Sequence, residues 1–231
     1  MDDQLTILGV SDVSYLSFIR TLFNSIKFNV KIPYKFHLYA INVSDKEIDF
    51  FKNNYENIEF TRDNIVLDDT SNKINPFGKS RKSAYCANIR ASIIYDLMCK
   101  GTKYILYLDA DSIVRRDLND LFLLIKQTDF IIFRRDKETD PRVKVLTSVV
   151  GINNNPKSLR FMSYWKDYML IPKNLYSWYS DQKYFYKAMI KLPDVKVQDL
   201  PVKYVDSSFL EKSFIWNGKG IRKYKHDIYI K

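Results

Sequence analysis

The chain has 231 residues, of which 46% are hydrophobic and 15% aromatic, so it can bury a full core, and we expect one globular domain over residues 1–231. This composition excludes a disordered or low-complexity chain, and no apolar run approaches the roughly 20 residues that span a bilayer. The formal net charge of +10 indicates anionic partners: nucleic acid, an anionic membrane surface or phosphate-bearing small molecules.

The N-terminus and the two cysteines indicate where the protein is located. Met1–Gln4 is acidic and lacks the charged-then-apolar pattern of a secretion signal. Cys86 and Cys99 have no metal-type spacing, so we interpret both as reduced packing residues. These features predict a cytoplasmic protein without a transmembrane segment.

The first sixty residues alternate between strand-like and helix-like patterns. Apolar runs predict strands at Leu5–Val10, Lys35–Val43 and Ile58–Phe60. Helical spacing predicts a helix over Tyr15–Ile26, and a capping box at Ser44–Glu47 predicts a second helix to about Tyr55.

Asp12 and Tyr15 follow the first of these strands, and two interpretations stay open. Asp12 could accept a hydrogen bond from a base N–H while Tyr15 stacks on the ring. Alternatively, Asp12 caps the helix and Tyr15 is a core aromatic.

A long polar loop is predicted from Asp63 to Lys82, followed by a helix over Ser83–Met98. Arg90 lies within this apolar-leaning helix. It is either a surface arginine or one that points toward sugar or phosphate oxygens.

The stretch Tyr104–Asp111 runs from apolar residues into two carboxylates. Both faces of the run are apolar, which predicts a central strand covered on both sides. Strand alternation would place Asp109 and Asp111 on one side, where their oxygens suit Mg²⁺ or Mn²⁺. The alternative is that the two residues only begin a turn.

The second half continues the alternation of strands and helices. We predict strands at Asp129–Arg134, Val143–Ile152, Val195–Val197 and Val202–Val205, with a helical segment at Asp117–Phe122 and helices at Lys157–Tyr168 and from Trp178–Gln182 through Ile190. Ser180 or Asp181 is the expected cap of the last helix.

This order predicts an α/β fold with a mostly parallel, doubly wound sheet flanked by helices. No Gly-x-Gly-x-x-Gly follows the first strand, which disfavours a dinucleotide dehydrogenase, and no phosphate loop of P-loop spacing is present.

Taken in order, the motifs resemble the Rossmann-like GT-A glycosyltransferases of family eight, the glycogenin and lipopolysaccharide galactosyltransferase group. The resemblance runs from Ile7 to Lys223. It implies a nucleotide and donor site made by Val10, Ser11, Asp12, Tyr15, Arg90, Asp109, Ala110, Asp111, Asn217, Gly218, Lys219, Gly220 and Arg222, with metal ligands Asp109 and Asp111 and catalytic residues Asp181 and Gln182.

The sequence departs from the family pattern at the sugar and metal sites. Leu146–Val149 replaces Asn-Ala-Gly-Val, and Asn88 stands where Tyr is usual. The C-terminal His that supplies a third metal ligand is missing, and His226 or Asp206 are the possible substitutes. The segment Trp216–Lys223 is expected to be a diphosphate clasp, which Phe214–Trp216 would anchor to the core.

The implied activity is a metal-dependent transfer of a sugar from a nucleotide-diphosphate sugar, a UDP-sugar, to an acceptor hydroxyl on a glycan. The cofactor would be Mn²⁺ or Mg²⁺, nucleic acid would not be a partner, and the chain could be one domain of a larger glycan-assembly system. Asp181 is the candidate base of an inverting enzyme, whereas Gln182 suits a retaining enzyme, which the resemblance favours. The rival interpretations are a non-catalytic nucleotide-sugar-binding module and a nucleic-acid-binding protein or metal nuclease.

Overall fold

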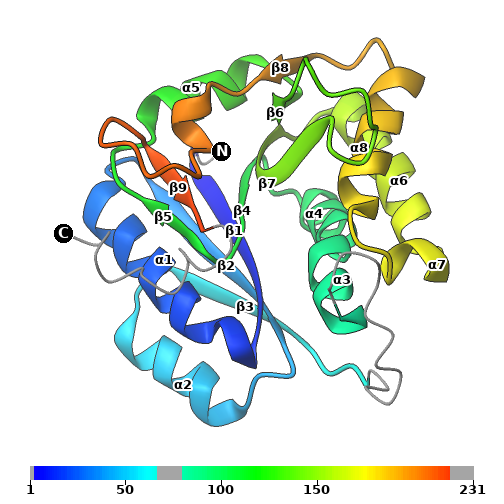
Figure 1. Ribbon diagram of the computed structural model, residues 1–231. Coiled ribbons are helices and arrows are strands. Elements are labelled where there is room, and N and C mark those ends of the chain that lie inside the picture. Colours follow the sequence, from blue (N-terminus) through cyan, green and yellow to red (C-terminus); the bar gives the residue numbers. More distant parts are fainter. Residues whose placement is uncertain (1–2, 67–79, 219–231) are drawn as a thin grey trace.

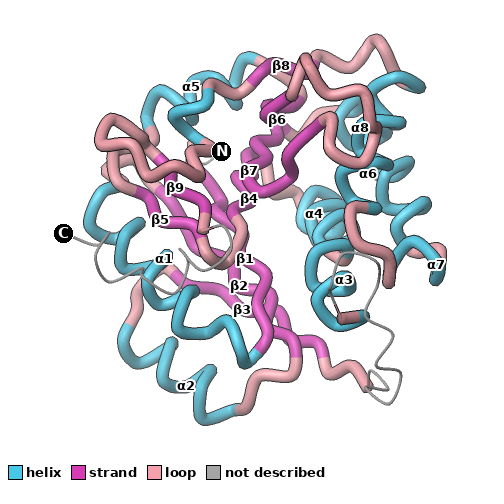
Figure 2. The backbone as a smooth tube through the Cα atoms, in the orientation of Figure 1, coloured by secondary structure: helices cyan, strands magenta, loops and turns pink. Residues whose placement is uncertain are grey.

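A seven-stranded sheet divides the computed structural model, which describes residues 3–66 and 80–218, into two layers of helices (Figures 1 and 2). The strands are β1 (Leu5–Asp12), β2 (Tyr34–Ile41), β3 (Ile58–Asp63), β4 (Tyr104–Leu108), β5 (Ser112–Val114), β6 (Phe130–Arg134), β7 (Val145–Asn153), β8 (Val197–Asp199) and β9 (Ile215–Asn217). The helices are α1 (Leu16–Asn29), α2 (Asp45–Asn54), α3 (Arg81–Asn88), α4 (Arg90–Cys99), α5 (Asn119–Gln127), α6 (Pro156–Met169), α7 (Pro172–Leu175) and α8 (Ser180–Lys191), with 3₁₀ helices η1 (Val13–Tyr15) and η2 (Val202–Tyr204).

The sheet order is β3-β2-β1-β4-β7-β6-β8, which confirms the predicted mixed, mostly parallel sheet. Strands β3, β2, β1 and β4 are parallel, whereas β7 is antiparallel to both β4 and β6. From β1 the chain adds β2 and β3 on one side and then returns to place β4 on the other side, so the direction of strand order reverses at β1. In open α/β sheets, ligands bind at the carboxyl ends of strands near such a switch.

Strands β1 and β4 lie at the centre because their side chains are apolar on both faces. Leu106 and Leu108 pack on the side of α1, α2 and α5, whereas Ile105 and Tyr107 pack on the side of α4, α6 and α8. The prediction of a central strand covered on both sides is therefore confirmed (Figure 1).

Local sequence sets several helix boundaries. The predicted capping box is present, since the Ser44 hydroxyl accepts from the Glu47 N–H and the Glu47 carboxylate accepts from the Ser44 N–H. Helix α6 begins with an Asn155 cap and Pro156 in its first turn. None of the helices in the described part of the chain combines the length and apolar character that crossing a bilayer needs.

Several predicted elements need correction. The predicted strand at Val202–Val205 is the 3₁₀ helix η2, because Pro201 has no N–H to continue the sheet ladder. The predicted helix over Ser83–Met98 is two helices, α3 and α4, that meet at Ile89. Strands β5 and β9, which pair with each other, were not predicted.

The two cysteines differ from the expectation in one respect. Both are free, but only Cys86 is partly buried, whereas Cys99 is exposed at the end of α4. Cys99 is therefore not a packing residue, because Leu97 and Met98 take the buried face of that last turn. Most of the predicted Asp63–Lys82 loop lies outside the described residues.

Candidate active site

A cavity opens at the carboxyl ends of β1 and β4. Every member of the predicted nucleotide and donor site that precedes residue 112 lines it: Val10, Ser11, Asp12, Tyr15, Arg90, Asp109, Ala110 and Asp111. Tyr107 and Trp178 also line it and were not predicted, and the remaining lining residues are Ser14, Ser83, Cys86 and Ala87. Tyr107 was overlooked because its ring fits the apolar pattern of β4, although its hydroxyl is polar.

Asp12 is both the cap of η1 and part of the cavity wall, so the two open interpretations are compatible. Its Oδ1 accepts from the Ser14 N–H at 3.0 Å and from the Ser14 hydroxyl at 2.6 Å. Its Oδ2 lies 2.7 Å from Lys82 Nζ. Burial opposes ionisation, but the bonds from Lys82 and Ser14 outweigh it and lower the pKa of Asp12. The carboxylate is therefore charged and held in place.

Asp109 and Asp111 lie in a turn that follows β4. The Ser112 N–H donates to the Asp109 carbonyl at 2.9 Å, which closes the turn, and the Asp109 N–H donates to the Ser148 carbonyl at 2.9 Å. The assumption of strand alternation was wrong at this point, because β4 ends at Leu108. The turn interpretation is correct for the backbone, yet the turn forms part of the cavity wall.

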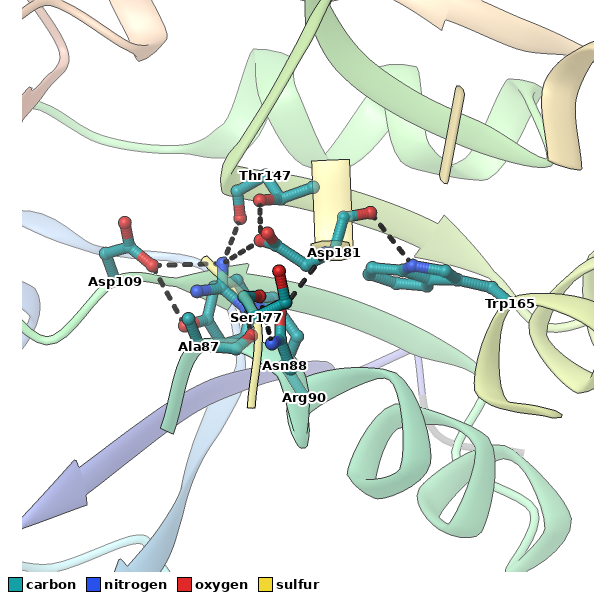
Figure 3. A network of polar contacts seen from close by, with 9 residues as sticks. Ala87, Asn88, Arg90, Asp109, Thr147, Trp165, Ser177 and Asp181 are labelled. Carbon is teal, nitrogen blue, oxygen red and sulfur yellow. Dashed lines mark hydrogen bonds and ion pairs between the residues drawn. The ribbon is translucent and has the colours of Figure 1, made fainter. Parts of the chain in front are cut away.

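Arg90 is buried, with 5% of its surface exposed, and lies between the carboxyl groups of Asp109 and Asp181 (Figure 3). Its Nη1 lies 3.1 Å from Asp109 Oδ1 and 3.8 Å from Asp181 Oδ2. The same atom donates to the Thr147 carbonyl at 2.6 Å, and Nε donates to the Ala87 carbonyl. The surface interpretation of Arg90 is therefore wrong.

The charge of Arg90 is stabilised by its surroundings. Burial opposes it, but the nearby Tyr107, Asp109 and Asp181 outweigh burial and raise the pKa of Arg90. The guanidinium lies over the Tyr107 ring at 4.4 Å from its centroid. Tyr107 in turn donates its hydroxyl proton to Asp109 Oδ1 at 2.9 Å, while burial raises the pKa of that hydroxyl.

Asp181 and Gln182 lie in the first turn of α8, beside a second cavity. Asp181 is 3% exposed, its Oδ2 accepts from the Thr147 hydroxyl, and burial raises the pKa of its carboxyl despite Arg90. Gln182 lines the same cavity, and its Oε1 is a buried acceptor without a hydrogen-bond partner in the described structure. Neither Ser180 nor Asp181 caps the helix, because the cap position is Tyr179.

The second cavity shares part of its wall with the first. Ala87, Arg90, Asp109 and Trp178 line both, whereas the segment Leu146–Ser148 lines only the second. Thr147 and Ser148 belong to the segment Leu146–Val149 that departs from the family pattern. The position of this segment in the family pattern was the sequence feature that could have indicated them as site residues.

The C-terminal part of the predicted site is only partly described. Asn217 pairs with Ser112 in the β5–β9 ladder, and the Gly218 N–H donates to the Asp111 carbonyl at 2.9 Å. Ile215 and Trp216 are buried and Phe214 is partly buried, so this segment packs against the core. Lys219, Gly220, Arg222 and His226 lie outside the described residues.

Asp206 does not offer a third metal ligand. Its Oδ1 accepts from the Ser208 N–H, and its Oδ2 accepts from the Leu210 N–H and the Ser213 hydroxyl. This carboxylate therefore holds a loop. Within residues 3–66 and 80–218, no group of three or more His, Cys, Asp or Glu side chains is placed to hold a metal ion.

Comparisons with solved structures show the same fold in known glycosyltransferases. The glycosyltransferase GlyE of Streptococcus pneumoniae TIGR4 superposes with a TM-score of 0.62 at 14% identity, and the match covers 97% of this chain and 59% of GlyE. The galactosyltransferase LgtC, solved in complex with donor and acceptor sugar analogues, gives 0.59 at 13% identity over 93% of this chain and 87% of LgtC. Mouse xyloside xylosyltransferase 1 gives 0.58 at 11% identity over 94% and 98%.

Sequence comparison supplies the family. No curated protein matched the chain. The model of glycosyl transferase family 8, in contrast, matches residues 6–170, which is most of the chain. The chain therefore belongs to glycosyl transferase family 8 and is a glycosyltransferase enzyme with the GT-A fold.

Proposed function

We propose that this enzyme transfers a sugar from a nucleotide-diphosphate sugar, a UDP-sugar, to a hydroxyl of a glycan acceptor in a metal-dependent reaction. The observation that carries the proposal is the first cavity, whose wall combines an aromatic ring and a carboxylate from the end of β1 with two carboxylates from the turn after β4. The residues from β1 can bind a nucleobase, and the carboxylates after β4 can hold a metal ion that binds a diphosphate, so one continuous site could bind the whole nucleotide.

The nucleotide end would be formed by Asp12 and Tyr15. The Tyr15 ring can stack on a base, an interaction that tolerates any ring but positions it well. Asp12 Oδ2, which holds Lys82 at 2.7 Å, is the acceptor available to a base N–H. A base would share this oxygen with Lys82 or displace it.

The metal would be held by Asp109 and Asp111, and their chemistry fits Mn²⁺ or Mg²⁺. Asp109 Oδ1 is bound by Arg90 and Tyr107, whereas Oδ2 forms no hydrogen bond or ion pair with the described residues. Asp111 lines the same cavity and is half-buried. Two carboxylates suit a hard cation that keeps water or phosphate oxygens in its remaining positions. When bound, the metal would neutralise the charge that develops on the diphosphate leaving group.

The residues around the second cavity would hold the sugar and the acceptor. Arg90 keeps the carboxyl groups of Asp109 and Asp181 in place and lies between them. Gln182 offers the unpartnered oxygen Oε1, which can face the positive charge of an oxocarbenium-like state. Asp181 is occupied by Thr147 and Arg90, so Gln182 is the better placed group, and this supports retention of configuration.

The test is a donor screen. Purified enzyme is incubated with UDP-, GDP-, CDP- and dTDP-sugars and Mn²⁺ or Mg²⁺, and release of the nucleotide is measured. We expect turnover of a UDP-sugar that stops in EDTA and falls at least about 100-fold in Asp109→Asn and Asp111→Asn, because each carboxylate stabilises the transition state through the metal.

Two outcomes would contradict the proposal. Full turnover in EDTA would show that the reaction needs no metal. A preference for another nucleotide would show that the donor is not a UDP-sugar. NMR of the product's anomeric configuration then decides between retention and inversion.

A further inference from the structure

We infer that Asn88 is a positioning residue for glycosyl transfer. Its carboxamide holds the end of α7 and the loop that precedes α8, together with the backbone of Asp181, and so fixes the wall between the two cavities. The inference rests on the proposed role of Asp181 at the donor sugar.

Both polar atoms of the Asn88 side chain form hydrogen bonds, and Figure 3 shows Asn88 beside two of its partners, Ser177 and Asp181. Nδ2 donates to the carbonyls of Asn174 at 3.0 Å, Leu175 at 2.8 Å and Ser177 at 2.9 Å. Oδ1 accepts from the Asp181 N–H at 3.1 Å. The side chain is 0% exposed, so its two N–H protons already serve three carbonyls and no donor remains for a substrate. Asn88 can therefore act on the reaction only through the residues that it holds.

The start of α8 needs such support from another element. The first N–H groups of a helix have no partner within the helix and usually bond to a capping side chain. The cap residue of α8 is Tyr179, which makes no side-chain capping bond and has a φ of 67°, a region that bulky residues rarely adopt. Asn88 supplies the missing acceptor from across the chain. Trp178 and Tyr179, which line the second cavity, lie within the segment that it holds.

Asn88 also couples this segment to the charged residues of the site. It is the last residue of α3, and Arg90 is the first residue of α4, so both extend from the junction at Ile89. Arg90 reaches the Asp181 carboxylate, while Asn88 binds the Asp181 backbone. One junction therefore sets both the position of Asp181 and the charge beside it.

The remaining anchors of Asp181 lie on other elements. Trp165 Nε1 donates to the Asp181 carbonyl at 3.0 Å, and the Thr147 hydroxyl donates to its carboxylate. Without Asn88 these contacts would keep α8 folded, but they do not reach the loop before it. We therefore expect misplacement of Asp181 and Trp178 rather than unfolding.

The matched control is Asn154, a second carboxamide that clamps two carbonyls at the opposite end of α4. Its Nδ2 donates to the Met98 carbonyl at 2.8 Å and to the Thr102 carbonyl at 2.9 Å. Asn154 lines neither the first nor the second cavity. A purely structural role of Asn88 would make the two variants alike.

The experiment compares Asn88→Ala and Asn154→Ala with the wild type. We measure the melting temperature, UDP affinity by calorimetry, kcat and KM for the UDP-sugar that the wild type uses, and hydrogen exchange of residues 174–181. Asn88→Ala should lower kcat roughly 10- to 100-fold with UDP affinity within about twofold, since small displacements of catalytic groups have effects of this size. Exchange at 174–181 should rise in this variant alone.

Three results would overturn the inference: wild-type kcat in Asn88→Ala, an equal loss of kcat in Asn154→Ala, or unchanged exchange at 174–181. A wild type that turns over no nucleotide sugar would instead reject the proposed function, and the exchange data would still report on the clamp.

If Asn88→Ala does not fold, Asn88→Asp is the second variant. Its carboxylate cannot donate to the three carbonyls, whereas the protonated form can donate once, and its buried site favours protonation. The ratio of its kcat to that of the wild type should rise as the pH falls. A ratio that stays flat with pH would contradict the clamp.

Discussion

Arg90 lies at unequal distances from two carboxyl groups, and this difference affects how the stability of the fold depends on pH. Asp109 is the nearer partner at 3.1 Å, and Asp181 lies at 3.8 Å in a fully buried position. Burial raises the pKa of Asp181, and Arg90 offsets this only in part. Because the folded pKa is above the unfolded value of about 3.9, ionisation of Asp181 favours the unfolded chain. The stability that its neutral form provides is present below about pH 4 and is lost as the pH rises through the folded pKa.

The substitution Asp181→Asn tests this at the scale of one residue. The amide is neutral at every pH and can still accept from the Thr147 hydroxyl, while Arg90 keeps Asp109 as its counter-charge. We expect a melting temperature at pH 7 equal to or above that of the wild type, with the two converging near pH 4. Transfer should fall at least about tenfold, with UDP affinity little changed. Thermal unfolding from pH 3 to 8 checks this, and a variant that is clearly less stable at pH 7 would show that the ion pair outweighs the cost of burial.

At the scale of elements, the sequence predicted what local patterns control. Strands β1, β2, β4 and β7, helices α1, α2 and α6, and the Ser44 capping box follow from apolar periodicity and from capping residues next to them. Asp12, Tyr15, Asp109 and Asp111 could be picked out because each lies at the end of a strand or shortly after one. The remaining parts depend on contacts between distant segments.

Three examples show why those parts could not be predicted. Strands β5 and β9 have three residues each and pair across about a hundred residues of chain, so neither has a periodic pattern of its own. The hydrogen bonds from Asn88 to the end of α7 and from Arg90 to Thr147 likewise join residues far apart in sequence. The α3–α4 break at Ile89 carries no Gly or Pro to mark it.

The β5–β9 ladder suggests how to test the C-terminal clasp. Residues Ile215–Asn217 pair with the strand that follows Asp111, and the Gly218 N–H bonds to the Asp111 carbonyl. A truncation that removes Asn217 and Gly218 would therefore disturb the Asp109–Asp111 turn as well as the basic residues beyond it. A truncation after Gly218 therefore tests the basic residues without disturbing this turn.

Deletion of residues 219–231 should weaken UDP binding at least about tenfold more than uridine binding, because Lys219, Arg222 and Lys223 supply positive charge for a diphosphate. The double variant Lys219→Ala with Arg222→Ala should show the same direction with a smaller loss. Calorimetry with both ligands measures this. Equal weakening of uridine and UDP, or none in either, would show that the segment does not bind the phosphates.

At the scale of the whole molecule, the candidate site joins the two sides of the fold. Asp12 and Tyr15 extend from β1 and η1, Arg90 from α4, Asp109 from the end of β4, and Asp181 from α8. The first three of these elements precede the central strand β4 and the last follows it, and the cores on the two faces of the sheet are separate clusters. A ligand that contacts all of these segments binds only the folded chain. Its binding free energy therefore adds to the stability of the whole molecule.

Thermal unfolding with ligands in stages measures this addition. At a concentration 100 times the dissociation constant, a ligand adds about 2.7 kcal/mol, which for a chain of this size is a shift of roughly 5–11 °C. We expect a small shift with uridine, a larger one with UDP in EDTA, and the largest with UDP and Mn²⁺. Tyr15→Ala should remove the uridine shift, because stacking contributes roughly 1–3 kcal/mol per base.

Asp111→Asn should remove only the increment that Mn²⁺ adds to the UDP shift, since the backbone bond between Asp111 and Gly218 is unaffected. Each variant is compared with its own unliganded form, so changes in basal stability cancel. A UDP shift of equal size in EDTA and in Mn²⁺ would mean that Asp109 and Asp111 hold no metal against the diphosphate, and that positive side chains alone neutralise it.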